Sequence, residues 1–229
     1  DLTQVTGDKW KDYSPCWLPD GRIVFVSERC LLSNRCSGEK DYEPGATLYS
    51  MKEDGTDIYP ISWNEINELH PSVDNQGRLV YTRWDYVDRD FSAAHHLWIS
   101  YPDGRDPRAP HANYPYPHST LDNKENAHDG RADRPWAEQY IRAIPGEAAK
   151  YSAIATGHHT HAAGPIIMID ISVPDDNKMS QVKVVTGSGK LPVDGAYLDN
   201  KQANYVTAWP LSIDFYIASE LHSRNVFLI

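Results

Sequence analysis

The sequence predicts an all-β protein, a β-propeller with four-stranded blades, because two phrases recur along the chain. Residues 13–27 (YSPCWLPDGRIVFVS) return as residues 69–83 (LHPSVDNQGRLVYTR), and residues 48–58 (LYSMKEDGTDI) return as residues 97–107 (LWISYPDGRDP). Each phrase reads as a pair of apolar strands closed by an Asp-Gly or Gln-Gly turn. Such regular strand–turn spacing is typical of sheets repeated around an axis.

A proline marks each expected inner strand, at Pro15, Pro71, Pro135 and Pro210. These markers predict a single propeller domain over residues 1–229, with about three and a half blades of a six- or seven-bladed propeller. The expected divisions are residues 1–12 as the outer strand of a preceding blade, 13–69 as a blade, 70–133 as a blade with a long cover loop, 134–207 as a blade and 208–229 as a partial blade.

The third and fourth copies are less regular than the first two. In the third, residues 134–146 replace the simple turn phrase, and residues 151–156, 166–171 and 182–186 are the next strands. The fourth copy begins at residue 209 and ends inside its third strand. Because residues 2–6 then form an orphan outer strand, the sheet edges favour a piece of a larger protein. The alternative is a closed four-bladed propeller in which residues 2–6 complete the last blade.

Composition and charge exclude two classes of partner. The 229 residues carry a formal net charge of -10, which would repel a nucleic-acid backbone or an anionic membrane surface. No apolar run approaches the length of a membrane span, so we expect no membrane insertion.

Three cysteines, Cys16, Cys30 and Cys36, lie near the start of the chain. Cys30 and Cys36 share one polar loop, where they could form a disulfide, remain free thiols or bind a metal. We expect the disulfide, which requires an oxidising compartment and therefore a periplasmic or secreted protein. Cys16 lies in an apolar phrase and is expected to be buried and free.

The motif Pro-x-Trp-x-Pro-Asp-Gly-Arg-Ile-x-Phe-x-Ser, followed by Leu-Tyr-x-Met-x-x-Asp-Gly, resembles the WD40-like repeat of TolB-type propellers. The longer features at residues 16–22, 94–98, 155–159 and 208–212 resemble the propeller middle domain of hydrazine synthase alpha subunits and their uncharacterised bacterial relatives. Those subunits use c-type haems. This chain has no Cys-x-x-Cys-His, so we expect no covalent haem within it.

Propeller topology places the Asp-Gly turns on one face and all ten histidines on the other. Histidine is the commonest metal ligand, so this segregation predicts a site for zinc or another transition metal. The candidate ligands are His95, His96, His158, His159 and His161. Adjacent histidines on a strand point to opposite sides, so one of each pair could instead pack between blades. Long loops also collect polar residues without any site.

Four residues that precede the marker prolines are expected to ring the mouth of the channel: Ser14, His70, Arg134 and Trp209. Of these, His70, Arg134 and Trp209 are the candidate ligand-binding residues. Arg134 with Arg131 offers a guanidinium fork for a carboxylate or phosphate, although arginines also close salt bridges between blades.

Two functions remain open from the sequence. The first is a ligand-, metal- or partner-binding propeller segment of a larger secreted or periplasmic protein. Its partners would be the remainder of the propeller or other domains of that protein, with a small-molecule ligand as a further candidate. The second is a catalytic redox or metal-dependent enzyme subunit similar to the hydrazine synthase alpha subunit. Fold kinship alone does not decide between them.

Overall fold

The structure, a computed structural model, describes residues 2–7, 9–34, 44–86, 94–113, 135–157, 162–176, 179–187, 191–192 and 204–229. Over these residues the fold is all-β, as predicted, with a single 3-10 turn, η1 (Glu28–Cys30). No helix in this described part of the chain is long and apolar enough to cross a membrane.

The first sheet is antiparallel in the order β1-β2-β3-β4. Its strands are β1 (Asp12–Trp17), β2 (Ile23–Ser27), β3 (Thr47–Met51) and β4 (Tyr59–Pro60). Every residue of β2 and β3 is buried, which explains why neither strand alternates apolar and polar residues as a half-exposed strand does. This sheet is the predicted repeat unit of two strand pairs.

The next two sets of strands repeat this plan. They are β5 (Glu68–Val73), β6 (Leu79–Trp84) and β7 (His95–Ser100), then β8 (Ala137–Ala143), β9 (Lys150–Thr156), β10 (Ile166–Asp170) and β11 (Val182–Val184). A bridge between Ile99 and Arg108 extends the first set by a fourth segment. One parallel pair, His95 with Ala137, joins the two sets into a seven-stranded sheet.

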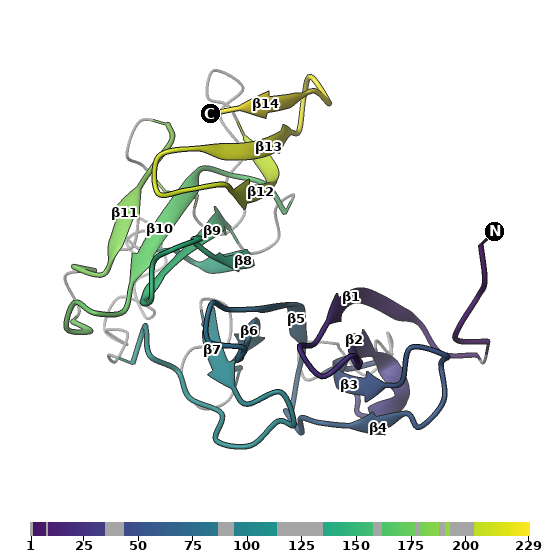
Figure 1. Ribbon diagram of the computed structural model, residues 1–229. Coiled ribbons are helices and arrows are strands. Elements are labelled where there is room, and N and C mark those ends of the chain that lie inside the picture. The colour runs from purple at the N-terminus through teal and green to yellow at the C-terminus, as the bar shows by residue number, and fades with distance from the viewer. Residues whose placement is uncertain are drawn as a thin grey trace.

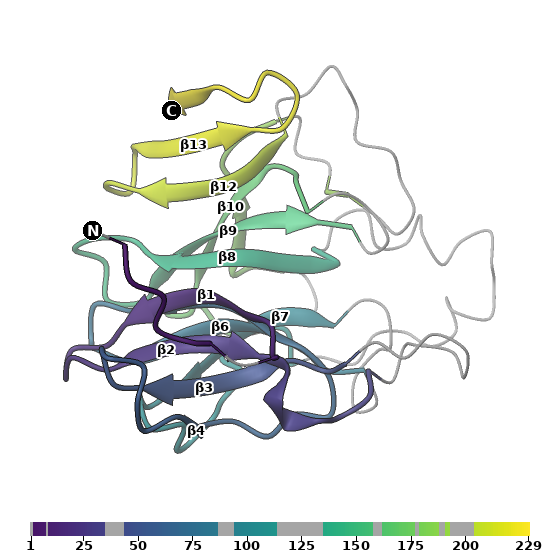
Figure 2. The ribbon, with the colours of Figure 1, turned by 90° about the vertical axis from the view of Figure 1, so that its right-hand side faces the viewer.

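The last sheet contains β12 (Tyr205–Pro210), β13 (Tyr216–Glu220) and β14 (Val226–Leu228). Strands β1, β5, β8 and β12 face a common centre, and β4, β11 and β14 lie on the outside (Figure 1). In the perpendicular view, β12 and β13 lie above β8 and β9, which in turn lie above the strands of the first two sets (Figure 2). These are the radial blades that the repeats predict.

Apolar side chains of neighbouring sheets form the core. Leu48 packs with Leu79 and Tyr81 between the first two sheets, and Leu97 packs with Ile167 in the next cluster. Full burial of one such side chain contributes roughly 1.5–3 kcal/mol. The sheets therefore depend on each other for their stability.

Three inner strands share a β-bulge. The register shifts at the same place in β1, β5 and β8, where Ser14, His70 and Tyr140 have φ of 52°, 53° and 54°. Tyr140 is thus the third-sheet counterpart of Ser14 and His70. Arg134 lies outside the described residues, and its place at the channel mouth stays a prediction. Alignment on the prolines does not locate the third bulge, because this bulge carries Ile141 where the other two carry proline.

The N-terminal residues 2–6 form no strand with the part of the chain that the structure describes, and their role as the outer strand of a preceding blade stays a prediction. Their backbone instead lies against the turn at Gly55, where an added Cβ would be 1.9 Å from the Val5 carbonyl oxygen. The same residues do not complete β14, which pairs only with β13 among the described strands.

The predicted disulfide is not formed, because Cys30 is a free thiol. Its Sγ donates to the carbonyl oxygen of Gly45 at 3.1 Å. Cys36 lies outside the described residues. Cys16 is free, as predicted, but only partly buried. The periplasmic or secreted location loses the support of the disulfide and stays a prediction.

The four glycine turns of the repeated phrases, at Gly21, Gly55, Gly77 and Gly104, have φ between 77° and 86°. Two of them provide a matched pair of substitutions. A Cβ on Gly21 would meet nothing within 4 Å, whereas a Cβ on Gly104 would lie 1.7 Å from the Ile61 carbonyl oxygen.

We predict that Gly21→Ala lowers the free energy of unfolding by about 1 kcal/mol, from backbone strain alone. Gly104→Ala adds a backbone clash between neighbouring sheets and should cost at least about 3 kcal/mol. Urea unfolding of both variants measures the difference. Equal losses would show that the contact between Gly104 and Ile61 is not formed.

Candidate functional site

A buried carboxylate, Glu138 at the start of β8, lies at the centre of the candidate site. The backbone N–H of Leu97 donates to its Oε2 at 3.0 Å. Its Oε1 is 2.7 Å from Nε2 of His111 and 3.4 Å from Nδ1 of His96. Glu138 and both histidines are fully buried. The cluster thus joins β7, β8 and the segment after β7.

The His111 ring is oriented by Gln181. The Gln181 side-chain nitrogen donates to the carbonyl oxygens of Val173 and Pro110, at 2.9 and 3.3 Å, which turns its Oε1 toward His111. That oxygen is 2.6 Å from His111 Nδ1. Nδ1 therefore carries a proton and donates it to Gln181, which leaves Nε2 directed at Glu138.

The electrostatics of the cluster favour a charged pair. Burial acts to raise the pKa of Glu138, but His111 and His96 outweigh it and hold the pKa of the carboxyl well below its usual range. Burial likewise acts to lower the pKa of His111, but the neighbouring Glu138 carboxylate outweighs it, and the pKa of His111 is raised. Without another cation, His111 is an imidazolium that donates to two oxygens.

The same three side chains offer the donor atoms of a transition-metal site. One ligand atom each from His96, His111 and Glu138 lie within 4.8 Å of one another. A metal-bound histidine usually donates its other ring N–H to an oxygen, as His111 does to Gln181. The arrangement can therefore hold either a proton or a metal cation between the imidazoles and the carboxylate.

The structure separates the two adjacent histidines of the prediction. His96 belongs to the Glu138 cluster, whereas His95 stacks on Trp84, with ring centroids 4.3 Å apart. This is the outcome that side-chain alternation on a strand allows. The other predicted metal ligands, His158, His159 and His161, lie outside the described residues.

His111 and Glu138 are not among the ligands that the sequence predicts. A signal for Glu138 was present, because Asp12, Glu68 and Glu138 each stand two residues before the positive-φ residue of an inner strand. No comparable repeat signals His111, which lies in an irregular segment. Its position becomes clear only in three dimensions.

A hollow of about 480 Å³ lies among the inner strands β1, β5, β8 and β12. Trp209, a predicted ligand-binding residue, lines it with Cys16, Ser72 and Arg142. His70 stacks on Tyr140 at 3.9 Å between ring centroids and is not among the lining residues. Arg134 lies outside the described residues.

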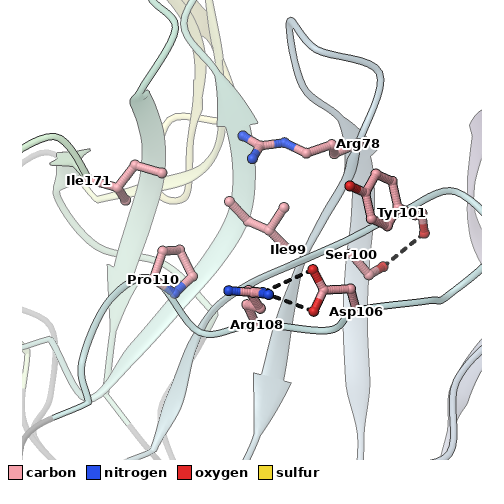
Figure 3. A pocket seen from close by; sticks show the side chains of 8 residues that line it. All are labelled: Arg78, Ile99, Ser100, Tyr101, Asp106, Arg108, Pro110 and Ile171. Atoms are coloured by element: carbon pink, nitrogen blue, oxygen red, sulfur yellow. Dashed lines mark hydrogen bonds and ion pairs between the residues drawn. The ribbon is translucent and has the colours of Figure 1, made fainter.

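A second hollow, of about 290 Å³, lies between the segment after β7 and residue Ile171 (Figure 3). Both of its arginines are already paired. Arg108 binds both carboxylate oxygens of Asp106 at 2.9 Å, and Arg78 binds Asp74 at 2.8 Å. These internal ion pairs leave no free cation for a ligand there.

No protein-family model matches the chain, and no curated protein is significantly similar to it in sequence. Among solved structures, hydrazine synthase from Kuenenia stuttgartiensis matches with a TM-score of 0.61 and 11% identity, over 90% of this chain and 26% of that chain. A putative TolB from Agrobacterium tumefaciens matches with a TM-score of 0.46 and 11% identity, over 79% of this chain and 50% of that chain. Both are β-propeller proteins, and the likeness to hydrazine synthase shows that this chain shares the fold.

The protonation of His70 provides a prediction about pH. Burial, together with the charge of Arg142, lowers the pKa of His70 to about 4. An unfolded chain binds that proton near pH 6.5, so the contribution of neutral His70 to stability is complete above 6.5 and is lost as the pH falls to about 4.

Asparagine tolerates the positive φ of this position. We therefore expect His70→Asn to reduce the loss of unfolding free energy between pH 6.5 and pH 4 by up to about 3 kcal/mol. Urea unfolding across this range measures it. The exposed His222→Asn serves as the control and should behave like the wild type. Identical pH profiles for all three proteins would contradict the burial of a neutral His70.

Proposed function

We propose that this chain is a metal-binding segment of a β-propeller within a larger protein, and that His96, His111 and Glu138 hold zinc or another transition metal. The observation that carries the proposal is the convergence of three buried ligand atoms within 4.8 Å, together with the Gln181 oxygen that orients His111. Two imidazoles and a carboxylate are a donor set that suits zinc.

Complete burial favours a structural role for the metal. The three ligands come from β7, from β8 and from the segment between them. A bound cation would therefore connect the two sets of strands that contain β7 and β8. Zinc prefers four ligands, and a water molecule or one further side chain would complete the set. Metal binding would then add to the stability of the folded state.

Two observations support a larger protein. The chain spans about a quarter of the hydrazine synthase chain that it matches, 26% of its length. The last sheet also exposes apolar side chains that a further blade or domain would cover, among them Val226, Phe227 and Leu228 of β14 at 68%, 42% and 68%. The proposed partner is accordingly the remainder of the propeller or another domain of the same protein.

The alternative of an enzyme subunit related to hydrazine synthase rests on fold similarity at 11% identity. Unrelated functions share the propeller, so this likeness carries no catalytic assignment. The buried cluster supports binding, and we propose a binding role.

The proposal predicts that the chain, purified without a histidine tag, contains about one zinc ion per molecule, because the described ligands form one site. Replacement by Co²⁺ should give visible absorption bands of a nitrogen- and oxygen-ligated metal. Removal of zinc with a chelator should lower the melting temperature, and added zinc should restore it.

Glu138→Gln keeps the shape of the side chain but removes the anionic ligand, and it should reduce zinc affinity by at least about tenfold. His222→Ala, at an exposed histidine, should bind like the wild type. A wild-type chain that contains no metal and whose melting temperature zinc does not change would show that the cluster is held by a proton.

A further inference from the structure

We propose that the hollow among the inner strands is a second binding site, for a small organic monocarboxylate. The carboxylate of this ligand binds the guanidinium of Arg142, and its body stacks beside Trp209. This site is independent of the Glu138 cluster.

Arg142 is a largely buried cation that has little to bind within the protein. Its Nε is buried without a hydrogen-bond partner, and its Nη1 donates only a long bond, of 3.4 Å, to the carbonyl oxygen of Ile141. Among the described residues no carboxylate lies within 4.0 Å of it. A buried charge without a counter-charge is costly, so this position calls for an anion.

Four other described arginines differ from Arg142 in this respect. Each forms an ion pair of 2.6–2.9 Å with an aspartate: Arg22 with Asp57, Arg78 with Asp74, Arg105 with Asp103 and Arg108 with Asp106. Arg142 has no such aspartate among the described residues, although it lines the larger of the two hollows described above. A cation left without a counter-charge beside a hollow is the feature expected of an anion site.

The contact of Arg142 with Trp209 does not use up its hydrogen-bond donors. The guanidinium carbon lies 5.0 Å from the ring centroid of Trp209, a cation–π contact. Such a contact involves no N–H···O hydrogen bond, so the N–H groups remain available as donors. A fork of parallel N–H groups matches the two oxygens of a carboxylate.

The walls of the hollow define the body of the ligand. Its volume of about 480 Å³ suits a small molecule. Strands β1, β5 and β12 and the turn after β8 contribute the prolines Pro15, Pro71, Pro145 and Pro210. Two indoles, Trp17 and Trp209, are 60% and 59% exposed beside them. Rigid apolar walls and indole faces favour a planar, apolar body such as an aromatic ring.

Charge distinguishes a monocarboxylate from a phosphate. One guanidinium can neutralise one negative charge, and the chain as a whole carries -10. A phosphate dianion or a polyanion would retain uncompensated charge in a hollow with apolar walls and would be repelled by the protein. A single carboxylate avoids both costs.

The test uses benzoate as the probe, measured by calorimetry and by the change in tryptophan fluorescence. Benzamide is the neutral control of the same shape, and inorganic phosphate is the alternative anion. We expect saturable benzoate binding at about millimolar concentration, at least about tenfold weaker binding of benzamide, and no binding of phosphate.

Arg142→Met keeps the length of the side chain and removes the charge, and it should weaken benzoate binding at least about tenfold. Arg105→Met, at an arginine that is paired with Asp103, should leave the affinity unchanged. If Arg142→Met fails to fold, Arg142→Lys keeps the charge without the fork and should also lose most of the affinity.

Absence of saturable benzoate binding, equal affinity for benzamide, or wild-type affinity in a folded Arg142 variant would each overturn the proposal. Tighter binding of phosphate than of benzoate would overturn the monocarboxylate assignment. Because zinc does not enter this experiment, its result is separate from that of the metal proposal.

Discussion

A buried carboxylate at the start of β5 and of β8 links the sheet that contains it to the preceding strands. Glu138 accepts the N–H of Leu97, a β7 residue in the preceding set of strands. Glu68 stands at the same position of β5, where it accepts from the Ser62 hydroxyl, which in turn accepts the N–H of Leu48 in the preceding sheet at 2.9 Å. The repeated leucine therefore has two roles, since its side chain packs in the core while its backbone N–H takes part in the hydrogen bonds of the next carboxylate. This repeated contact helps to hold neighbouring sheets together.

The partners of this carboxylate differ from blade to blade. They stabilise the fold in every case, but in only one blade do they form a candidate ligand site. Asp12 pairs with Arg29, and Glu68 accepts from the Ser62 hydroxyl with Arg83 at 4.0 Å. Burial raises the pKa of Glu68 to about 7, so that carboxyl is partly protonated near neutral pH. Only Glu138, among these three, meets two imidazoles. A repeated structural contact thus provides one of the candidate ligands of the proposed metal site in one blade.

Repetition explains which features the sequence could predict. The glycine turns and strands of the first two copies follow from local patterns, and β9, β10 and β11 lie where apolar runs indicated. The third bulge could not be located, because Ile141 stands where its counterparts are prolines. The site was harder still to predict, since His111 and Glu138 are 27 residues apart in the sequence and meet only in the folded chain. Adjacent histidines gave no indication of which one pointed inward, and packing of His95 on Trp84 decided it.

The bulge in β8 explains how one short strand can serve two different sites. Glu138 and Arg142 are four residues apart, so on a regular strand they would point to the same side. The register shift between Gln139 and Arg142 inserts one extra residue, with Tyr140 at φ 54°, and this reverses the side on which later residues lie. Glu138 therefore meets β7 of the preceding strands, while Arg142 stacks on Trp209 in β12 of the following sheet. The bulge keeps an acidic and a basic side chain of one strand apart, so that neither neutralises the other and each is available for a separate partner.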